Sequence, residues 1–270
     1  MAKISQEDKH HYFEKIKPYR ENIKAILSKE ETVLAEIKKD DTDAAFKRLG
    51  LVDEMLNMAS NYIVVSGASQ SMLKLRNEEA LNDARKSIYK AAIYLEEVVS
   101  NYVDAPFSDY EDKLEEIAAL DSAQRYLLAR KLGLCIQLLK NAYGDNTKWR
   151  WAFVELEGRC AAGIKNVYDI KNAVTYTTDP SSPHYEPAIR HLRLIKKLLM
   201  QAADRYREKY ELSTNRIDDF KMGIHFLGSL RRIHIILGDR EDAETVKKKQ
   251  DIWSTKLEMD IKKAEEAAKK

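Results

Sequence analysis

The sequence is poor in residues that interrupt helices. Only 9 glycines and 5 prolines occur in 270 residues, and three of the prolines, Pro180, Pro183 and Pro187, lie close together. Glycine and proline are the commonest helix breakers, so long stretches of the chain carry no local stop signal. Between these points apolar residues recur at spacings of three and four, which indicates amphipathic helices. We therefore predict an all-α protein, either an antiparallel multi-helix bundle or an irregular helical-hairpin array, with about 8–10 helices.

Cysteine is almost absent as well. Cys135 and Cys160 are the only two, and they flank a predicted turn at Gly144-Asp145-Asn146. A bridge across a helical hairpin is geometrically conceivable, but in a reducing compartment two buried free thiols are the expected state. Close Cys/His pairs, the usual source of zinc ligands, are missing, and Glu7-x-x-His10 is the single Glu-x-x-His pair where a di-iron bundle needs two. We predict no metal and no cofactor.

The sequence also lacks a large excess of positive or negative charge, and it lacks long apolar runs. With 46 basic and 44 acidic residues the formal net charge is +2, so no global field attracts nucleic acid or anionic membrane. The polar start of the chain predicts no secretory signal, and we expect no membrane span and a cytoplasmic location. Phosphate-binding and nucleophile-elbow glycine motifs are missing too, which predicts a protein that is not an enzyme.

The first 40 residues carry a heptad-like pattern. Ile16, Tyr19, Ile23, Ile26, Val33 and Ile37 follow alternating spacings of three and four, interrupted by Glu30. The pattern predicts a helix hairpin or short coiled coil that starts around Pro18, a residue suited to a first helical turn. This seam, residues 16–37, packs either inside its own bundle or against a second copy in a homo-oligomer.

Capping residues predict where further helices begin. Asn77 caps a helix that ends before Asp104, and the pairs Ser108 with Glu111 and Asp121 with Gln124 form capping boxes. The helix after Asp121 carries its apolar face to the turn at Gly144, and another helix runs from about 147 to 175. That apolar face comprises Tyr126, Leu127, Cys135, Leu138 and Leu139.

The proline cluster predicts a division of the chain. We expect an N-terminal helical bundle over 1–176, a stiff loop or linker over 177–187, and a C-terminal bundle over 188–270 that is either separate or continuous with the first. Helices of about 186–211, 215–237 and 240–267 build the last part, and Gly238-Asp239 is a stop followed by a new cap.

One segment, 224–250, resembles a tetratricopeptide-like helical hairpin. Leu227, Leu230, His234, Gly238 and Ala243 fall at its large apolar, leucine, tyrosine-like, turn-glycine and small positions. Arg231 and Lys247 depart from the pattern, where the family has a small and an aromatic residue, and the terminal proline is absent. The resemblance implies a helical-hairpin protein that binds peptides or partner proteins on a concave face, without catalysis.

Two groups of residues are candidate contact sites. Trp149-Arg150-Trp151 combines residue types enriched at interfaces, although packing against neighbouring helices also explains both indoles. Arg190, Arg193 and Lys197 share one helix face and, with Arg231 and Arg232, could bind an anion, although a solvated polar face is the simpler interpretation. By contrast, residues 104–122 carry seven acidic residues and one lysine.

These patterns favour a noncatalytic helical scaffold or adaptor that mediates protein–protein interaction by binding another protein or a peptide. The alternative is binding of nucleic acid or another anionic ligand through the basic C-terminal face, detectable by its salt dependence. A third hypothesis, an enzyme with a polar pocket between helices, rests on the richness in Tyr and Arg, such as Arg125-Tyr126.

Overall fold

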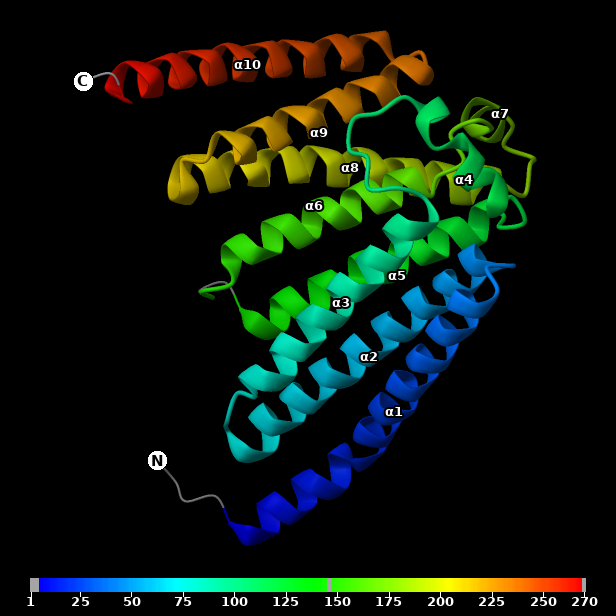
Figure 1. Cartoon of the computed structure of the whole chain (residues 1–270), viewed down its shortest axis with the longest axis vertical. Helices are drawn as coiled ribbons and strands as arrows, with labels where there is room; N and C mark the ends of the chain where they lie inside the picture. The colour runs from blue at the N-terminus through cyan, green and yellow to red at the C-terminus, as the bar shows by residue number, and fades with distance from the viewer. Residues whose placement is uncertain (1–4, 145–146, 269–270) are drawn as a thin grey trace. The chain divides into compact units, whose positions relative to one another are not determined.

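The computed structural model describes residues 5–144 and 147–268, and every regular element in this part of the chain is helical (Figure 1). The α-helices are α1 (Gln6–Lys39), α2 (Ala44–Leu73), α3 (Glu78–Val98), α4 (Glu111–Glu116), α5 (Ser122–Tyr143), α6 (Arg150–Asn166), α7 (Ala173–Thr178), α8 (Tyr185–Lys209), α9 (Ile217–Ile236) and α10 (Arg240–Ala268). A 3₁₀ helix, Phe107–Asp109, precedes α4, and a π-helical turn, Tyr210–Thr214, follows α8. The all-α prediction is confirmed. Asp145 and Asn146, part of a predicted turn, lie outside the described residues.

The chain divides into two compact units. The first comprises Met1–Val99 and Leu128–Arg150, and the second comprises Ser100–Leu127 and Trp151–Lys270. The predicted bundles 1–176 and 188–270 are therefore not the compact units, because the proline-rich segment 177–187 lies inside the second unit. Its prolines stand at or near helix ends, with Pro187 in the first turn of α8, where the missing N–H has no helical partner to lose.

Helix α1 begins earlier than the sequence indicated. Ser5 is its N-cap: the Asp8 N–H donates to Ser5 Oγ at 2.9 Å, and the Ser5 N–H donates to Asp8 Oδ2 at 3.2 Å. Pro18 lies inside the helix and does not start it, and Figure 1 shows α1 bending in its N-terminal half. Residues 6–39 form one helix, so the predicted hairpin within 1–40 is wrong: the capping box supplies a start ahead of the proline.

The heptad-like seam of α1 packs within the first unit. Ile16, Ile23 and Ile26 are buried. Glu30, which interrupts the apolar pattern, is only 5% exposed, and its carboxylate accepts hydrogen bonds from Lys90 Nζ at 2.8 Å and from the Tyr94 hydroxyl. Burial and this hydrogen bond raise the pKa of Tyr94. The residue that breaks the apolar pattern thus forms a buried hydrogen-bonded contact between α1 and α3, made by Glu30, Lys90 and Tyr94 and here named the polar lock.

Helix α2 is long and unbroken, and α3 begins where the sequence predicts. Residues 62–71, β-branched in part, continue α2 without a break. Asn77 caps α3, because its side-chain oxygen accepts from the Ala80 N–H at 3.0 Å. Residues 55–73 of α2 carry no charge, yet they include several serines, asparagines and a glutamine. No helix among the described residues is long and apolar enough to cross a membrane.

In the second unit, one predicted capping box forms and the other does not. The Gln124 N–H donates to Asp121 Oδ1 at 2.8 Å, and the Asp121 N–H donates to Gln124 Oε1 at 3.0 Å, so α5 starts as expected. Ser108 lies instead within the 3₁₀ helix, where its hydroxyl donates to Asp109. The N-cap of α4 is Tyr110, which makes no side-chain capping bond.

The helix predicted over 147–175 is interrupted after Asn166. Asn166 is fully buried, and its Nδ2 donates to the carbonyl oxygens of Ser100 and Tyr102, each at 3.0 Å. Arg125 Nη1 donates to the carbonyl oxygen of Val167 at 2.9 Å. These side chains fix the chain at the end of α6, and residues 164–176 contain neither glycine nor proline. The prediction of one continuous helix is therefore wrong.

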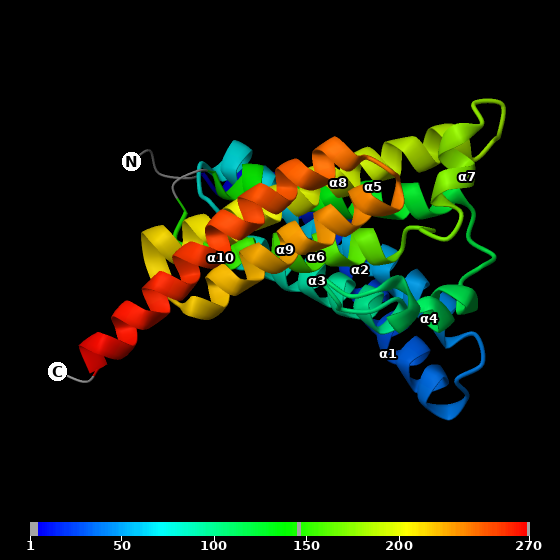
Figure 2. The same cartoon turned by 90° about the horizontal axis from the view of Figure 1, so that it is seen from above.

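Helices α8, α9 and α10 build the last part of the second unit (Figures 1 and 2). Gly238, with φ of 76°, makes the turn between α9 and α10 as predicted. The rings of Tyr210 and Phe220 stack with their centroids 4.9 Å apart. The ring centroid of Trp253, on α10, lies 5.8 Å from that of Phe220. A Cβ at Gly223 would lie 3.0 Å from the Ala203 carbonyl oxygen, so glycine permits the close approach of α8 and α9.

His191 of α8 is a buried imidazole. The residue is 1% exposed, and its Nε2 lies 3.0 Å from the Ile164 carbonyl oxygen. The centroids of the His191 and Tyr168 rings are 5.0 Å apart. Burial lowers the pKa of His191 to about 4, because the charged form would lose its hydration. The side chain is therefore neutral at physiological pH.

A first prediction concerns Glu30. Glu30→Ala leaves the Tyr94 hydroxyl without its acceptor, whereas Lys90, 48% exposed, can turn to water. We expect the free energy of unfolding to fall by about 2 kcal/mol in urea denaturation. Glu31→Ala, one residue along on the exposed side, should change it by less than about 0.5 kcal/mol. Equal losses in the two variants would refute the polar lock.

A second prediction concerns acid. Because the folded-state pKa of His191 lies below its ordinary value of 6.5, the unfolded chain binds this proton first as pH falls. Stability should therefore decrease between pH 6.5 and pH 4, with about 3 kcal/mol attributable to this group. His191→Gln, which can still donate to Ile164, should show a shallower decline over the same range in urea titrations. Parallel curves for the two proteins would contradict the assignment.

Candidate functional site

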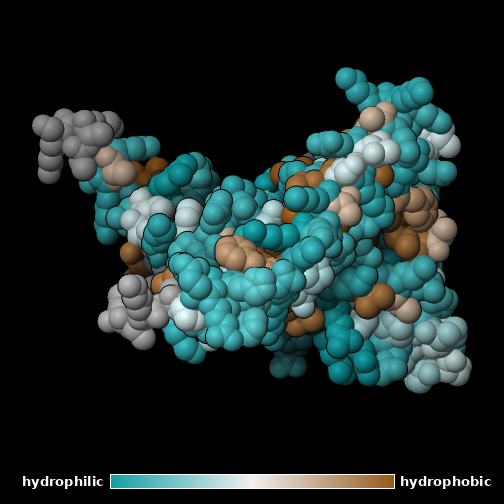
Figure 3. All heavy atoms as spheres, turned by 90° about the horizontal axis from the view of Figure 1, so that it is seen from below, coloured by the Kyte–Doolittle hydropathy of each residue, from teal (hydrophilic) through white to brown (hydrophobic). Residues whose placement is uncertain are grey.

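The face shown in Figure 3 is mainly hydrophilic, and hydrophobic side chains reach it in small separate patches. Isolated exposed apolar residues are normal, so a candidate binding surface needs a cavity beside them. The first unit has such a place, a groove of about 450 Å³ between α2 and α5, here named the α2–α5 groove. It is lined by Asp53, Glu54, Leu56, Asn57, Ser60, Lys131, Leu134, Cys135 and Leu138. This volume is in the range of ligand pockets.

The α5 wall of the groove is apolar and accessible. Leu134 is 54% exposed and Leu138 is 42% exposed, one helical turn further along. The expected apolar face of this helix is thus only partly buried: Cys135 and Leu139 are in the core, whereas Leu138 and also Leu127, at 50%, are exposed. Leu127, Leu134 and Leu138 are spaced i, i+7 and i+11, which places them on one stripe of α5.

The α2 wall is polar. Asn57 and Ser60 lie one turn apart, and the Ser60 hydroxyl donates to the carbonyl oxygen of Leu56 at 2.9 Å. Cys135 Sγ lies 3.6 Å from the same carbonyl oxygen. Burial raises the pKa of the Cys135 thiol. Both cysteines are free and buried, so neither the hydroxyl nor the thiol in this groove has the surroundings of an activated nucleophile.

Ion pairs stand at one end of the groove. Lys131 Nζ lies 2.7 Å from Asp53 Oδ2, and Lys29 pairs with Glu54. Three of these four side chains are more than 40% exposed, and exposed pairs contribute about 0.2–1 kcal/mol each. A partner could therefore exchange these pairs for its own at little cost.

The second unit has an acidic pocket of about 440 Å³ beside α4. Its lining includes six charged residues, Glu111, Glu115, Asp121, Arg125, Asp169 and Lys171, together with Tyr176 and His184. Lys171 Nζ lies 2.8 Å from Glu111, whose carboxylate raises the pKa of that lysine. The acidic segment 104–122 thus contributes a wall of this pocket.

Arg125 lies at the base of the acidic pocket and is only 4% exposed. Besides Val167, its guanidinium donates to the carbonyl oxygens of Leu120 and Ile117, each at 2.9 Å. The sequence drew attention to Arg125 as part of a hypothetical catalytic pocket. Its donors are used instead on backbone carbonyls, so it holds the loops in place.

The predicted site Trp149-Arg150-Trp151 falls across the division of the chain. Trp149 and Arg150 belong to the first unit, and Trp151 belongs to the second. The Arg85 guanidinium of α3 lies 4.7 Å from the centroid of the half-buried Trp149 ring, and Lys148 Nζ lies 5.4 Å from it. Arg150 is exposed and Trp151 is half-buried. At least Trp149 therefore contributes to packing.

The predicted anion-binding residues lie on α8 and α9. Arg190, Arg193 and Lys197 are all exposed, as expected for a polar helix face, while Arg231 and Arg232 are partly buried. Arg190 pairs with Glu186 one turn earlier, and Arg232 Nη2 lies 3.0 Å from Asp104 Oδ1. Two of the five cations are thus matched by carboxylates of their own unit.

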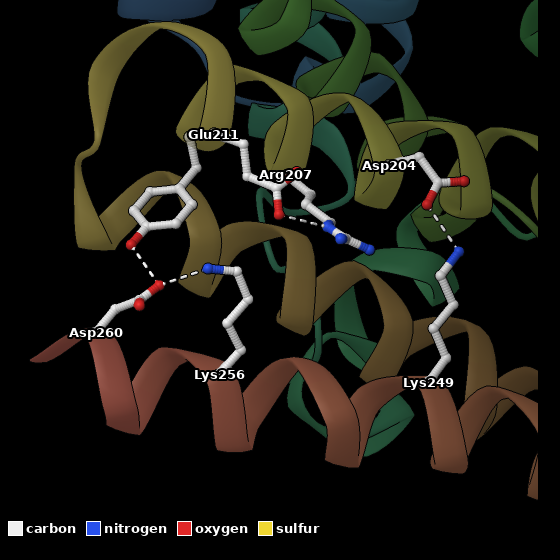
Figure 4. Close-up of polar contacts among 7 residues, drawn as sticks. Asp204, Arg207, Glu211, Lys249, Lys256 and Asp260 are labelled. Carbon is white, nitrogen blue, oxygen red and sulfur yellow. Dashed lines mark hydrogen bonds and ion pairs between the residues drawn. The ribbon is translucent and has the colours of Figure 1, made fainter.

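Further cations at the C-terminal end of α8 and on α10 are also paired with carboxylates. Lys249 Nζ lies 2.7 Å from Asp204 of α8, and Arg207 pairs with Glu211 at 2.9 Å (Figure 4). Lys256 Nζ and the Tyr210 hydroxyl both donate to Asp260, at 2.7 and 2.9 Å, and lower the pKa of that carboxyl. Much of the positive charge in the C-terminal half is therefore neutralised locally.

The groove residues were not among the sites predicted from the sequence. The available signal was the i, i+7, i+11 spacing of Leu127, Leu134 and Leu138, which marks a second apolar stripe on the helix 122–143 beside the buried one. A helix with two such stripes has more apolar surface than one core contact uses.

The described residues define an all-α protein with a groove in one helical unit and an acidic pocket in the other. The chain belongs to the TP0443 family, whose model matches residues 8–261. No curated protein and no solved structure matches the chain.

A third prediction tests the role of Arg125. Arg125→Lys cannot reach three carbonyl groups in different directions, so at least two of them lose a donor. We expect the free energy of unfolding to fall by about 3 kcal/mol in urea denaturation. Arg130→Lys, an exposed position on the same helix, should leave it unchanged within about 0.5 kcal/mol. A small loss at both positions would mean that Arg125 does not hold the loops.

Proposed function

We propose that the protein is a noncatalytic helical adaptor that binds an amphipathic helical segment of a partner protein in the α2–α5 groove. The observation that carries the proposal is the pair of accessible leucines, Leu134 and Leu138, beside a cavity of about 450 Å³. Leucines that face a cavity and remain about half exposed have apolar area left to bury, worth about 1 kcal/mol each.

The groove favours a helical ligand. Leu134 and Leu138 are one turn apart along α5, which matches a ligand helix that presents apolar residues at i and i+4. Asn57 and Ser60 on the opposite wall offer hydrogen-bonding groups to the polar side of such a helix. The Lys131–Asp53 pair at one end can meet a charge of either sign on the ligand.

The proposal that the protein is noncatalytic is supported by the surroundings of its serine, cysteine and arginine side chains in the two cavities. The Ser60 hydroxyl donates to a backbone carbonyl, and burial keeps the Cys135 thiol protonated. Arg125 in the acidic pocket is engaged by carbonyl groups. A cytoplasmic location remains part of the same proposal.

The alternative, anion or nucleic-acid binding through the C-terminal basic residues, has less support, because Arg190, Arg232 and Lys249 are paired with carboxylates. The tetratricopeptide resemblance also remains a prediction. In its favour, Leu227, Leu230, His234 and Ala243 are buried in the α9–α10 hairpin, and Gly238 makes the turn.

A fourth prediction tests the groove. A photo-crosslinking amino acid at position 57, introduced in the native cell, should capture a partner. The double variant Leu134→Ser/Leu138→Ser should reduce that crosslink at least tenfold, because the apolar wall is lost. The matched control is Ile252→Ser/Met259→Ser on α10, with exposures of 68% and 56%, and it should leave the crosslink intact. Both double variants should melt within a few degrees of the parent, since the side chains are surface-exposed.

The outcome separates the two functions. The captured segment, made as a peptide, should gain helical circular dichroism on binding and should bind with little dependence on salt. If the crosslink survives the leucine changes, the groove is not the binding site. If binding is lost instead on Arg193→Glu/Lys197→Glu and falls steeply with salt, the anion-binding alternative holds.

A further inference from the structure

The turn between α9 and α10 brings together three residues of types that bind metals. His234 lies in the last turn of α9, Asp239 directly follows Gly238, and Asp242 lies in the first turn of α10. The left-handed backbone of Gly238 reverses the chain, so that an imidazole and two carboxylates face one another. We name them the α9–α10 triad.

The separations within the triad suit a shared ion. His234 Nδ1 lies 3.2 Å from Asp239 Oδ2 and 3.6 Å from Asp242 Oδ2, and all three ligand atoms lie within 4.8 Å of one another. In a tetrahedral site with metal–ligand bonds of about 2.0–2.1 Å, neighbouring ligand atoms are about 3.3 Å apart. The two measured separations bracket that value, so only small side-chain movements are needed.

Burial fixes one ligand and leaves the others accessible. The His234 side chain is 8% exposed, whereas those of Asp239 and Asp242 are 37% and 66% exposed. The imidazole is therefore held by the hairpin core, while the carboxylates open to solvent, from which water can complete the coordination. A nitrogen ligand beside two carboxylates favours zinc-like transition metals over Mg²⁺ or Ca²⁺, which take oxygen ligands.

Lys196 of α8 competes for the same carboxylate. Its Nζ lies 2.6 Å from Asp239 Oδ2, and this lysine and His234 together lower the pKa of Asp239. The Lys196 side chain is 27% exposed, so its ammonium can turn away into water. Because the ammonium lies close to the position that an ion would occupy, substitution of Lys196 should change the affinity of the triad for an ion.

We propose that His234, Asp239 and Asp242 bind a divalent transition-metal ion of the Zn²⁺ class and that this ion joins the end of α9 to the start of α10. The site is separate from the α2–α5 groove and independent of the proposed adaptor function. Its effect would be to stabilise the hairpin, because an ion that binds only the folded state adds to its stability.

A fifth prediction tests the triad with Zn²⁺ added to metal-free full-length protein. Calorimetry should show one site, and thermal unfolding should shift upward with Zn²⁺ but not with Mg²⁺. His234→Gln and Asp242→Asn should each weaken Zn²⁺ binding at least tenfold. The matched controls are His225→Gln and Glu241→Gln, exposed neighbours on the same two helices, and they should bind as the parent does. Asp242 is largely exposed, so its variant should fold normally.

The variant Lys196→Met distinguishes a metal site from a simple ion-pair cluster. If the triad binds metal, removal of the competing ammonium should tighten Zn²⁺ binding several-fold. If the residues form only an ion-pair cluster, Lys196→Met should lower stability without any change in Zn²⁺ affinity. Absence of binding at millimolar Zn²⁺, or equal binding by His234→Gln and the parent, would overturn the proposal. Co²⁺ spectra distinguish the triad from Cys135 and Cys160, because thiolate ligands give a charge-transfer band that imidazole and carboxylate do not.

Discussion

Buried side-chain donors that bind backbone carbonyl groups are the constraint on which the second unit depends. With few glycines or prolines to stop helices, the chain ends them with tertiary hydrogen bonds. Asn166 donates to Ser100 and Tyr102, Lys165 donates to Val103, and Arg125 donates to Ile117, Leu120 and Val167. Burial lowers the pKa of Lys165 to about 8, a sign of how far this donor is withdrawn from water. A buried carbonyl without a donor costs about 1–3 kcal/mol, so the loops and the acidic pocket beside them exist only while these donors stay in place.

The features that could be predicted from the sequence are those with a local signal. The all-helical class, the Asn77 cap, the Asp121–Gln124 capping box and the Gly238 turn all depend on residues within a few positions of one another. Predictions were wrong where residues far apart in the sequence determine the local structure. The nearest glycine, Gly163, lies inside α6 and no proline follows closely, so the stop after Asn166 depends on partners more than 60 residues earlier in the chain. At Pro18 the error was of another kind: a residue common at helix starts is also tolerated inside a long helix that has a better cap upstream.

The candidate sites show the same limit. The pairing of Arg190 with Glu186 follows from their i, i+4 spacing, but that of Arg232 with Asp104 joins residues 128 positions apart. Composition alone therefore overstated the positive charge that the C-terminal half offers to a ligand. For α5, helical periodicity identifies apolar stripes but cannot say which stripe meets the core. Cys135 and Leu139 pack inward and Leu134 and Leu138 do not, and that choice is made by the neighbouring helices.

Glu30 also sets the alignment of α1. It occupies the same position of the seven-residue repeat as Ile16, Ile23 and Ile37. A slide of α1 by one repeat would bring an isoleucine opposite Lys90 and Tyr94, and the Tyr94 hydroxyl would lose its acceptor. The shifted helix would still present a nearly identical apolar seam, so hydrophobic packing alone distinguishes the two alignments poorly. A single carboxylate thus selects one register of a repetitive helix, in the way that a lone polar residue does in a coiled coil.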